Sequence, residues 1–216
     1  MCGDGVKDLQ LSPEQEALSR TLRQFARKEL APHSAAWDRS GRFPAEAWRR
    51  MGELGILGLR IPATYGGQEA DFLTYGIAME EIGRGDFSCT YGIQLAGLAG
   101  EILGRSAPEA LKARWLPPTA AGEAVVALAL TEPGAGSDAG NTRTTADLRD
   151  GSWVLNGSEL FITNPGTGVT WGVTTTARTG NDEISSIVVE NGTPGYSISA
   201  PMKKLGWRAS DTRELS

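Results

Sequence analysis

The sequence ALTEPGAGSD at residues 129–138, followed by LNGSELFITN at residues 155–164, decides the interpretation of this chain. The first segment is an apolar strand that ends abruptly in a loop of small residues. Gly134 and Gly136 allow backbone N–H groups to turn toward one point, and Ser137 adds a hydroxyl donor. Such a loop is suited to hold a phosphate or the polar edge of a ring without a formal cation.

The second segment adds an aromatic ring and a hydroxyl. Phe161 and Thr163 are two residues apart, so a regular strand would place both on one face. Together the segments indicate a flat, partly polar cofactor lying on a β-domain. On the residues alone, however, the loop at 131–137 is explained as well by a long hairpin connection, because Gly, Pro and Ser are common turn residues.

Composition changes near residue 122. Valine and threonine together number 6 in residues 1–122 and 20 in residues 123–216, while alanine falls from 17 to 9. Alanine favours helices and β-branched residues favour strands. We therefore predict an α+β chain, with an all-helical domain at 1–122 and an all-β domain, a small barrel or sandwich, at 123–216.

Helix signals are clear in the first half. Ser12-Pro13-Glu14-Gln15 offers an N-cap serine, a proline at the first helical position and a capping-box glutamine. Three later segments carry helical patterns: Phe43-Pro44 to Gly55, Phe72 to Ile82, and Cys89 to Leu103. Pro117-Pro118 is expected to break the chain before the β-domain.

Six strands are predicted in the second half: Ala124–Leu130, Thr142–Leu148, Ser152–Thr163, Val169–Ala177, Ile184–Glu190 and Tyr196–Pro201. Asp150-Gly151 marks a tight hairpin turn between two of them.

Net charge, the numbers of histidines and cysteines, and the lack of long apolar runs exclude several classes of protein. A formal charge of −5 argues against a nucleic-acid scaffold, and one histidine with two distant cysteines, Cys2 and Cys89, argues against a zinc site or any other metal centre. Residues 1–11 have no apolar run of a secretory signal, and no stretch is long enough to span a membrane. A cytoplasmic location is expected.

Other candidate residues are explained more simply by structure. Glu80 and Glu81 face different directions on a helix, so we expect a solvated or ion-paired face. His33, after a proline, is expected on a surface loop. Cys89 is interpreted as packing, and Gly92 and Gly100 as sites of close helix–helix contact.

Five segments, in the same order, resemble the acyl-CoA dehydrogenase family. They are PATYGG at 62–67, EEIGRGD at 80–86, ALTEPGAGSD at 129–138, LNGSELFITN at 155–164 and KKLGWRASDTREL at 203–215. The resemblance implies FAD as cofactor and eight residues as its contacts: Leu128, Leu130, Thr131, Gly136, Ser137, Phe161, Ile162 and Thr163. It further implies that Thr131 hydrogen-bonds the flavin ring near N5, and that Ser137 also faces an acyl-CoA thioester substrate.

Three places depart from the family pattern, one of them Asn164-Pro165, where the proline stiffens the loop beyond the strand. Phe161 stands where many members have a tryptophan. The phenylalanine keeps an aromatic face for stacking but lacks the indole N–H donor. Glu159 stands where a lysine is usual, and alternation along the strand predicts that its side chain points to solvent.

The resemblance implies α,β-desaturation of an acyl thioester, as in fatty acid metabolism, with electrons passing to an acceptor flavoprotein. It also implies a homo-oligomer when full-length, and a third, C-terminal helical domain that carries the catalytic glutamate and is absent from these 216 residues. No catalytic residue is therefore assigned. Two alternatives stay open: a flavin oxidase or monooxygenase of the same fold, and a non-catalytic chain completed by another polypeptide.

Overall fold

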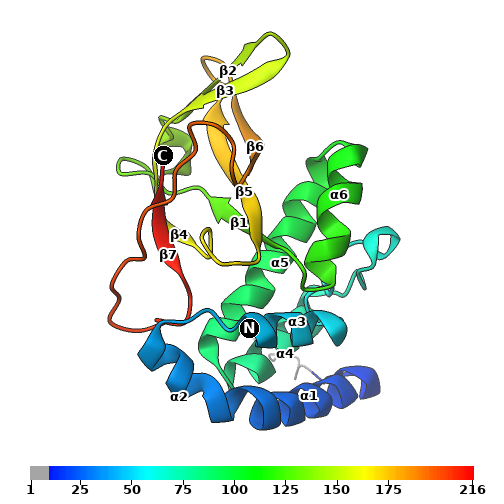
Figure 1. Cartoon of the computed structure of the whole chain (residues 1–216). Helices are drawn as coiled ribbons and strands as arrows, with labels where there is room; N and C mark the ends of the chain where they lie inside the picture. The colour runs from blue at the N-terminus through cyan, green and yellow to red at the C-terminus, as the bar shows by residue number, and fades with distance from the viewer. Residues whose placement is uncertain (1–9) are drawn as a thin grey trace, which may run out of the picture.

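The computed structural model describes residues 10–216, so Cys2 lies outside the described residues. Its N-terminal half is helical and its C-terminal half is built of strands, which form separate layers side by side (Figure 1). Six α-helices occur in the described range: α1 (Pro13–Phe25), α2 (Ala31–Ser40), α3 (Ala45–Glu53), α4 (Phe72–Gly83), α5 (Phe87–Ser106) and α6 (Glu109–Ala120).

The first helix begins as predicted. The Ser12 hydroxyl accepts the Gln15 backbone N–H at 3.2 Å, and the Gln15 side chain accepts the Ser12 N–H at 3.0 Å. This capping box satisfies two otherwise unpaired donors. A π-helical turn, Ala26–Leu30, then joins α1 to α2.

The structure differs from the sequence predictions in two helical segments. His33 lies inside α2 and not in a loop, although it is exposed as expected. Helix α6 continues through Pro117 and Pro118 to Ala120, because Trp115 and its neighbours are buried and anchor this turn. The prolines remove donors only for the carbonyls of residues 113 and 114, which are exposed to water.

Close contacts inside the helical domain confirm the prediction for Gly92, which meets Trp48 of α3, whereas Gly100 meets the turn at Arg60 and not another helix. A Cβ on Gly92 would lie 2.8 Å from the Trp48 ring, and one on Gly100 would lie 2.7 Å from a backbone oxygen of Arg60. Cys89 is buried in the core.

Glu81 is buried and pairs with Arg23, whose side chain is 44% exposed. Arg23 donates to its carboxylate at 2.5 and 2.9 Å, and Ser19 donates at 2.8 Å. The Arg23 hydrogen bonds lower the pKa of Glu81 and keep it charged in spite of burial. Glu80, by contrast, pairs with Arg84 at the exposed surface. The ion-paired interpretation of this helix face is confirmed.

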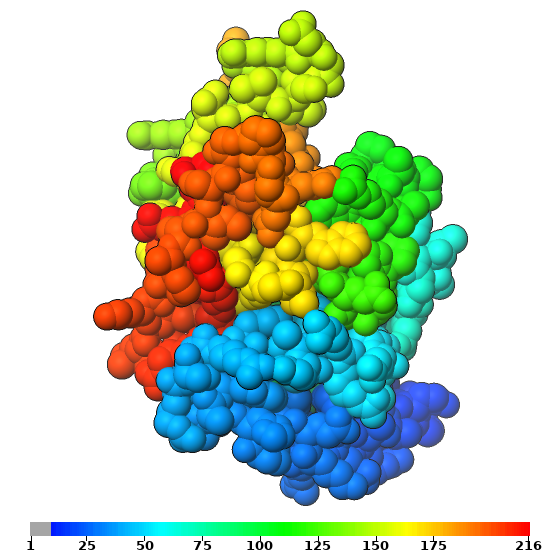
Figure 2. Space-filling view, viewed as in Figure 1, coloured from blue at the N-terminus to red at the C-terminus, as the bar shows by residue number. Residues whose placement is uncertain are grey.

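Seven strands occur in the described range: β1 (Val125–Ala129), β2 (Thr145–Arg149), β3 (Ser152–Asn156), β4 (Glu159–Thr163), β5 (Thr170–Arg178), β6 (Ile184–Glu190) and β7 (Thr212–Leu215). The main sheet has the order β1-β5-β2-β3, with β6 antiparallel to β5, and β1 runs parallel to β5. Strands β4 and β7 form a second, antiparallel pair. The β2–β3 hairpin projects from the end of the molecule (Figures 1 and 2).

The strand predictions hold except in two places. The predicted strand Ser152–Thr163 divides into β3 and β4 at Gly157, whose backbone lies so close to Thr144 that a Cβ would be 2.1 Å from the hydroxyl. The predicted strand Tyr196–Pro201 contributes only a bridge from Ile198 to Leu215, and β7 was not predicted. The turn at Asp150-Gly151 is confirmed, with φ of 49° and 79°.

Strand β1 packs against both halves of the chain. Val125 belongs to the helical core around Trp48, and Val126 packs in a second cluster with Trp115. Ala127 and Ala129 belong to the core of the β-domain, with Ile162, Val173 and Leu215. In the described residues, no helix is long and apolar enough to cross a membrane.

Candidate functional site

The two sequence segments that indicated a cofactor lie side by side in the structure. The Leu160 N–H on β4 donates to the Thr131 carbonyl, just beyond the end of β1, at 2.6 Å. This bond fixes the loop after β1 against the strand that carries Phe161 and Thr163. The fold therefore brings the two segments onto one surface.

The loop after β1 begins with a short hydrogen-bonded turn, and its glycines are exposed to solvent. Glu132 and Ala135 exchange backbone hydrogen bonds of 2.7 and 3.2 Å. Gly134, Gly136 and Ser137 are exposed, and a Cβ on Gly136 would meet only the Thr131 methyl group at 3.9 Å. The glycines thus leave backbone accessible to a ligand.

The Glu132 side chain fixes this loop to residues 142–144. Its buried carboxylate accepts hydrogen bonds from the Thr142 hydroxyl, from the Arg143 N–H at 2.7 Å and from the Thr144 N–H at 2.8 Å. Burial raises its pKa, but these hydrogen bonds together outweigh burial and the net pKa is lowered. The loop is anchored by a charged side chain that the sequence analysis did not single out.

Strand β4 is irregular at the aromatic residue. Phe161 has a φ of 59°, and the pairing with β7 shifts register between Glu159 and Ile162. The bulge leaves the Phe161 ring 63% exposed while the Ile162 side chain is 2% exposed. A large aromatic ring is therefore held outward by a strained backbone, which is the kind of conformation found at ligand sites.

The remaining predicted contacts divide into two groups. Leu128 and Leu130 are half-buried, and the Ile162 side chain lies in the β-domain core and faces away from the surface. The other group presents hydroxyls that have no hydrogen bond within residues 10–216: those of Thr131, Ser137 and Thr163. The exposed Phe161 ring and these three hydroxyls belong to the two segments that the Leu160–Thr131 hydrogen bond joins.

Glu159 does not point to solvent, so that prediction was wrong. Its side chain is 5% exposed, and its Oε1 accepts the Thr175 hydroxyl at 2.9 Å. The bulge at Phe161 is the reason: it breaks the alternation, so that Glu159 and Phe161 lie on opposite sides of β4.

The pKa of the Glu159 carboxyl is raised, which favours its neutral form. Burial, followed by the nearby charge of Glu132, raises its pKa from 4.5 to about 7. Because the folded state then holds a proton that the unfolded state releases, the free energy of unfolding must fall as pH rises from about 4.5 to about 7.

We therefore expect Glu159→Gln to be more stable than the parent chain at pH 8 but equal to it at pH 5. The difference should reach roughly 3 kcal/mol, because the pKa rises from 4.5 to about 7 and each pKa unit corresponds to about 1.36 kcal/mol. Urea unfolding at the two pH values measures it. A stability difference that does not change with pH would contradict the assignment.

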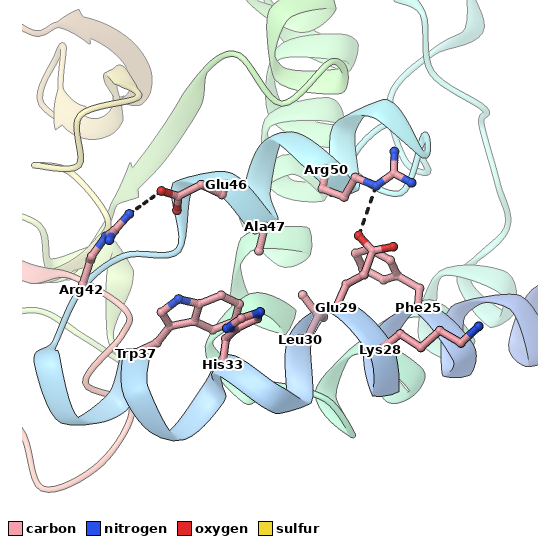
Figure 3. A pocket seen from close by; sticks show the side chains of 10 residues that line it. All are labelled: Phe25, Lys28, Glu29, Leu30, His33, Trp37, Arg42, Glu46, Ala47 and Arg50. Atoms are coloured by element: carbon pink, nitrogen blue, oxygen red, sulfur yellow. Dashed lines mark hydrogen bonds and ion pairs between the residues drawn. The ribbon is translucent and has the colours of Figure 1, made fainter.

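A cavity of about 420 Å³ lies away from this surface, between α1–α2 and α3 (Figure 3). Arg42 pairs with Glu46 there, Arg50 pairs with Glu29 at 3.2 Å, and the His33 ring faces Trp37. Lys28 also lines this cavity, and none of the predicted cofactor contacts does.

Sequence comparison identifies both halves. The profile of the acyl-CoA dehydrogenase N-terminal domain matches residues 12–123, and that of the acyl-CoA dehydrogenase middle domain matches residues 127–216. A short-chain specific acyl-CoA dehydrogenase of Clostridium acetobutylicum is 39% identical over 213 residues, which are 96% of this chain and 56% of that protein. The chain spans about half the length of the curated relatives it matches.

Solved structures agree. A glutaryl-coenzyme A dehydrogenase in complex with glutaryl-CoA has a TM-score of 0.90 at 34% identity, covering 96% of this chain and 54% of that one. A glutaryl-CoA dehydrogenase from Mycobacterium smegmatis, in complex with FADH2, has a TM-score of 0.89 at 34% identity, covering 97% and 53%. The chain therefore belongs to the acyl-CoA dehydrogenase family, of which residues 12–216 form the N-terminal and middle domains.

Proposed function

We propose that this chain forms the flavin-binding part of an FAD-dependent acyl-CoA dehydrogenase, which desaturates an acyl thioester between its α and β carbons. The observation that carries the proposal is the hydrogen bond from the Leu160 N–H to the Thr131 carbonyl, which joins the loop after β1 to the strand that exposes the Phe161 ring. FAD would supply the acceptor for the hydride that leaves the β carbon.

The residues of this chain have positioning roles in that scheme. Phe161 would stack on the isoalloxazine ring, Thr131 and Thr163 would hydrogen-bond its polar edge, and Ser137 would lie between the cofactor and the acyl-CoA. The exposed glycine backbone of the loop would approach the pyrophosphate. Orientation of two reactants in this way contributes much of the acceleration in a reaction between bound groups.

Several further assignments belong to the same proposal. We place the division between the two domains at residues 122 and 123, in the link between α6 and β1. We also assign the electron acceptor to a separate flavoprotein, the active form to a homo-oligomer and the compartment to the cytoplasm. The support for these is the family membership.

FAD binding tests the site. We expect the chain to quench FAD fluorescence at equilibrium, and Phe161→Ala to weaken that binding about tenfold, because loss of an aromatic stacking partner removes roughly 1.5 kcal/mol. Phe72→Ala is the matched control, since Phe72 is equally exposed, at 68%, but lies on α4. Equal affinities for all three proteins would show that FAD does not bind on β4.

Acyl-CoA turnover with FAD and an artificial acceptor tests the reaction. An alkene product, formed without peroxide, is expected. Peroxide or an oxygenated product would replace the dehydrogenase with an oxidase or monooxygenase.

A further inference from the structure

The last residue of β5, Arg178, is bonded to a segment that lies more than thirty residues earlier in the chain. Its Nε donates to the Thr142 carbonyl at 2.7 Å, and its Nη2 donates to the Gly140 carbonyl at 2.8 Å. Its backbone N–H donates to the Thr144 carbonyl, also at 2.8 Å. One residue therefore fixes three alternate carbonyl groups to the end of a strand of the main sheet.

An arginine is suited to this arrangement. The guanidinium is planar, and its nitrogens donate in fixed directions, so that two carbonyls can be held in one geometry. The two carbonyls that it binds, of Gly140 and Thr142, lie at the end of the short 3-10 turn Ala139–Asn141. A lysine ammonium is a compact charge on a flexible stem, so it would not fix both carbonyls in the same way.

The segment that Arg178 holds is the one that anchors the loop after β1. The three donors to the Glu132 carboxylate all come from residues 142–144. Thr142 is bonded on both sides, because its carbonyl accepts from Arg178 and its hydroxyl donates to Glu132. Glu132 in turn follows Thr131 directly in the chain. Hydrogen bonds therefore connect the end of β5 to the loop at 131–137 without a gap.

We propose that Arg178 is a positioning residue for FAD: acting through residues 140–144 and Glu132, it sets the position of the loop at 131–137 on the β-domain. The inference rests on the proposed function, in which this loop supplies Thr131 and Ser137 to the cofactor. Arg178 is not among the proposed FAD contacts, so its effect on the cofactor passes through the loop.

Backbone hydrogen exchange tests the positioning without any cofactor. The amides of Arg143 and Thr144 donate to Glu132, and we expect them to exchange about tenfold faster in Arg178→Lys than in the parent, because the segment opens more often once its anchor is weakened. Amides in the middle of α5 should exchange at the parent rate. Arg149→Lys is the matched control, since Arg149 also ends a strand, β2, but pairs with Asp147 at the exposed surface.

Quenching of FAD fluorescence tests the consequence for the cofactor. Arg178→Lys should weaken FAD binding about tenfold, the factor that corresponds to the loss of one hydrogen bond to a charged group, whereas Arg149→Lys should bind FAD as the parent does. Thr142→Val removes the hydroxyl that donates to Glu132 and leaves the Thr142 carbonyl to Arg178, so it should weaken binding as well. Because both substitutions act through Glu132, the double variant should bind FAD no more weakly than the weaker of the two single variants.

The outcomes separate this inference from the proposed function. Equal FAD affinities of Arg178→Lys and the parent would overturn the role of Arg178 and leave the proposed function standing. Faster exchange throughout the helices, or additive effects of Arg178→Lys and Thr142→Val, would also overturn that role, because Arg178 would then stabilise the fold without acting through Glu132. Failure of the parent chain to bind FAD would overturn the proposed function, and this inference with it.

Discussion

Glu132→Gln is expected to lower the free energy of unfolding by about 4 kcal/mol, because a charged acceptor of three hydrogen bonds is replaced by one neutral oxygen and an N–H₂ group. The Thr142 hydroxyl and the Arg143 and Thr144 N–H groups all donate to this carboxylate. Glu132 is 6% exposed, so water cannot replace the lost acceptor. Each of these buried donors that stays unpaired adds its own desolvation cost.

The same substitution should weaken FAD binding, since the loop at 132–137 loses the anchor that joins it to residues 142–144. Glu123→Gln is the control, because Glu123 is exposed near the start of β1. Urea unfolding and FAD fluorescence measure the two effects. If Glu132→Gln unfolds at the same urea concentration as Glu123→Gln, the loop is not held by this carboxylate.

Gly52→Ala is expected to lower the free energy of unfolding by about 3 kcal/mol, because the added methyl group would clash with its neighbours. This loss outweighs the higher intrinsic helix propensity of alanine. A Cβ at this position of α3 would lie 2.2 Å from the Ala121 carbonyl oxygen and 2.5 Å from the Gly122 nitrogen. These are backbone atoms in the link between α6 and β1, so no side chain can move aside. The helix and the link would have to separate.

Gly76→Ala is the matched control, because Gly76 lies inside α4 and a Cβ there would meet nothing within 4 Å. Alanine should stabilise that helix by roughly 0.5–1 kcal/mol through its lower conformational entropy in the unfolded chain. Opposite signs for the two glycines in thermal unfolding are therefore expected. A Gly52→Ala protein as stable as the parent would show that α3 can move away from the link.

The sequence predicted those elements whose signals are local. The capping box of Ser12 and Gln15, the turn at Asp150-Gly151 and the helical and β-rich halves each follow from neighbouring residues. It did not predict β7, because this strand exists only through its pairing with β4, about fifty residues earlier in the chain. The prolines of α6 misled for a similar reason, since burial of Trp115 outweighs their local effect.

The two candidate cofactor segments could be chosen from the sequence, but the local geometry around Glu159 could not be predicted. Thr131, Ser137, Phe161 and Thr163 could be chosen from motif residues; the structure joins their two segments through the Leu160–Thr131 hydrogen bond, and the cofactor contacts themselves stay a prediction. Glu159 was misplaced because strand alternation assumes a regular β4, and a bulge cannot be detected from the identity of a phenylalanine. The positive φ of Phe161 lies within the register shift of β4 against β7 and next to the Leu160–Thr131 hydrogen bond, and both of these are tertiary features.

Strand β1 has a consequence for how the chain unfolds. Because Val125 and Val126 complete the helical cores and Ala127 and Ala129 complete the β-domain core, neither half keeps a closed interior once this strand is withdrawn. The two domains are thus coupled into one cooperative unit, despite their different architectures. A molecule bound at the loop after β1 would therefore protect the distant helices from unfolding as effectively as it protects the strands.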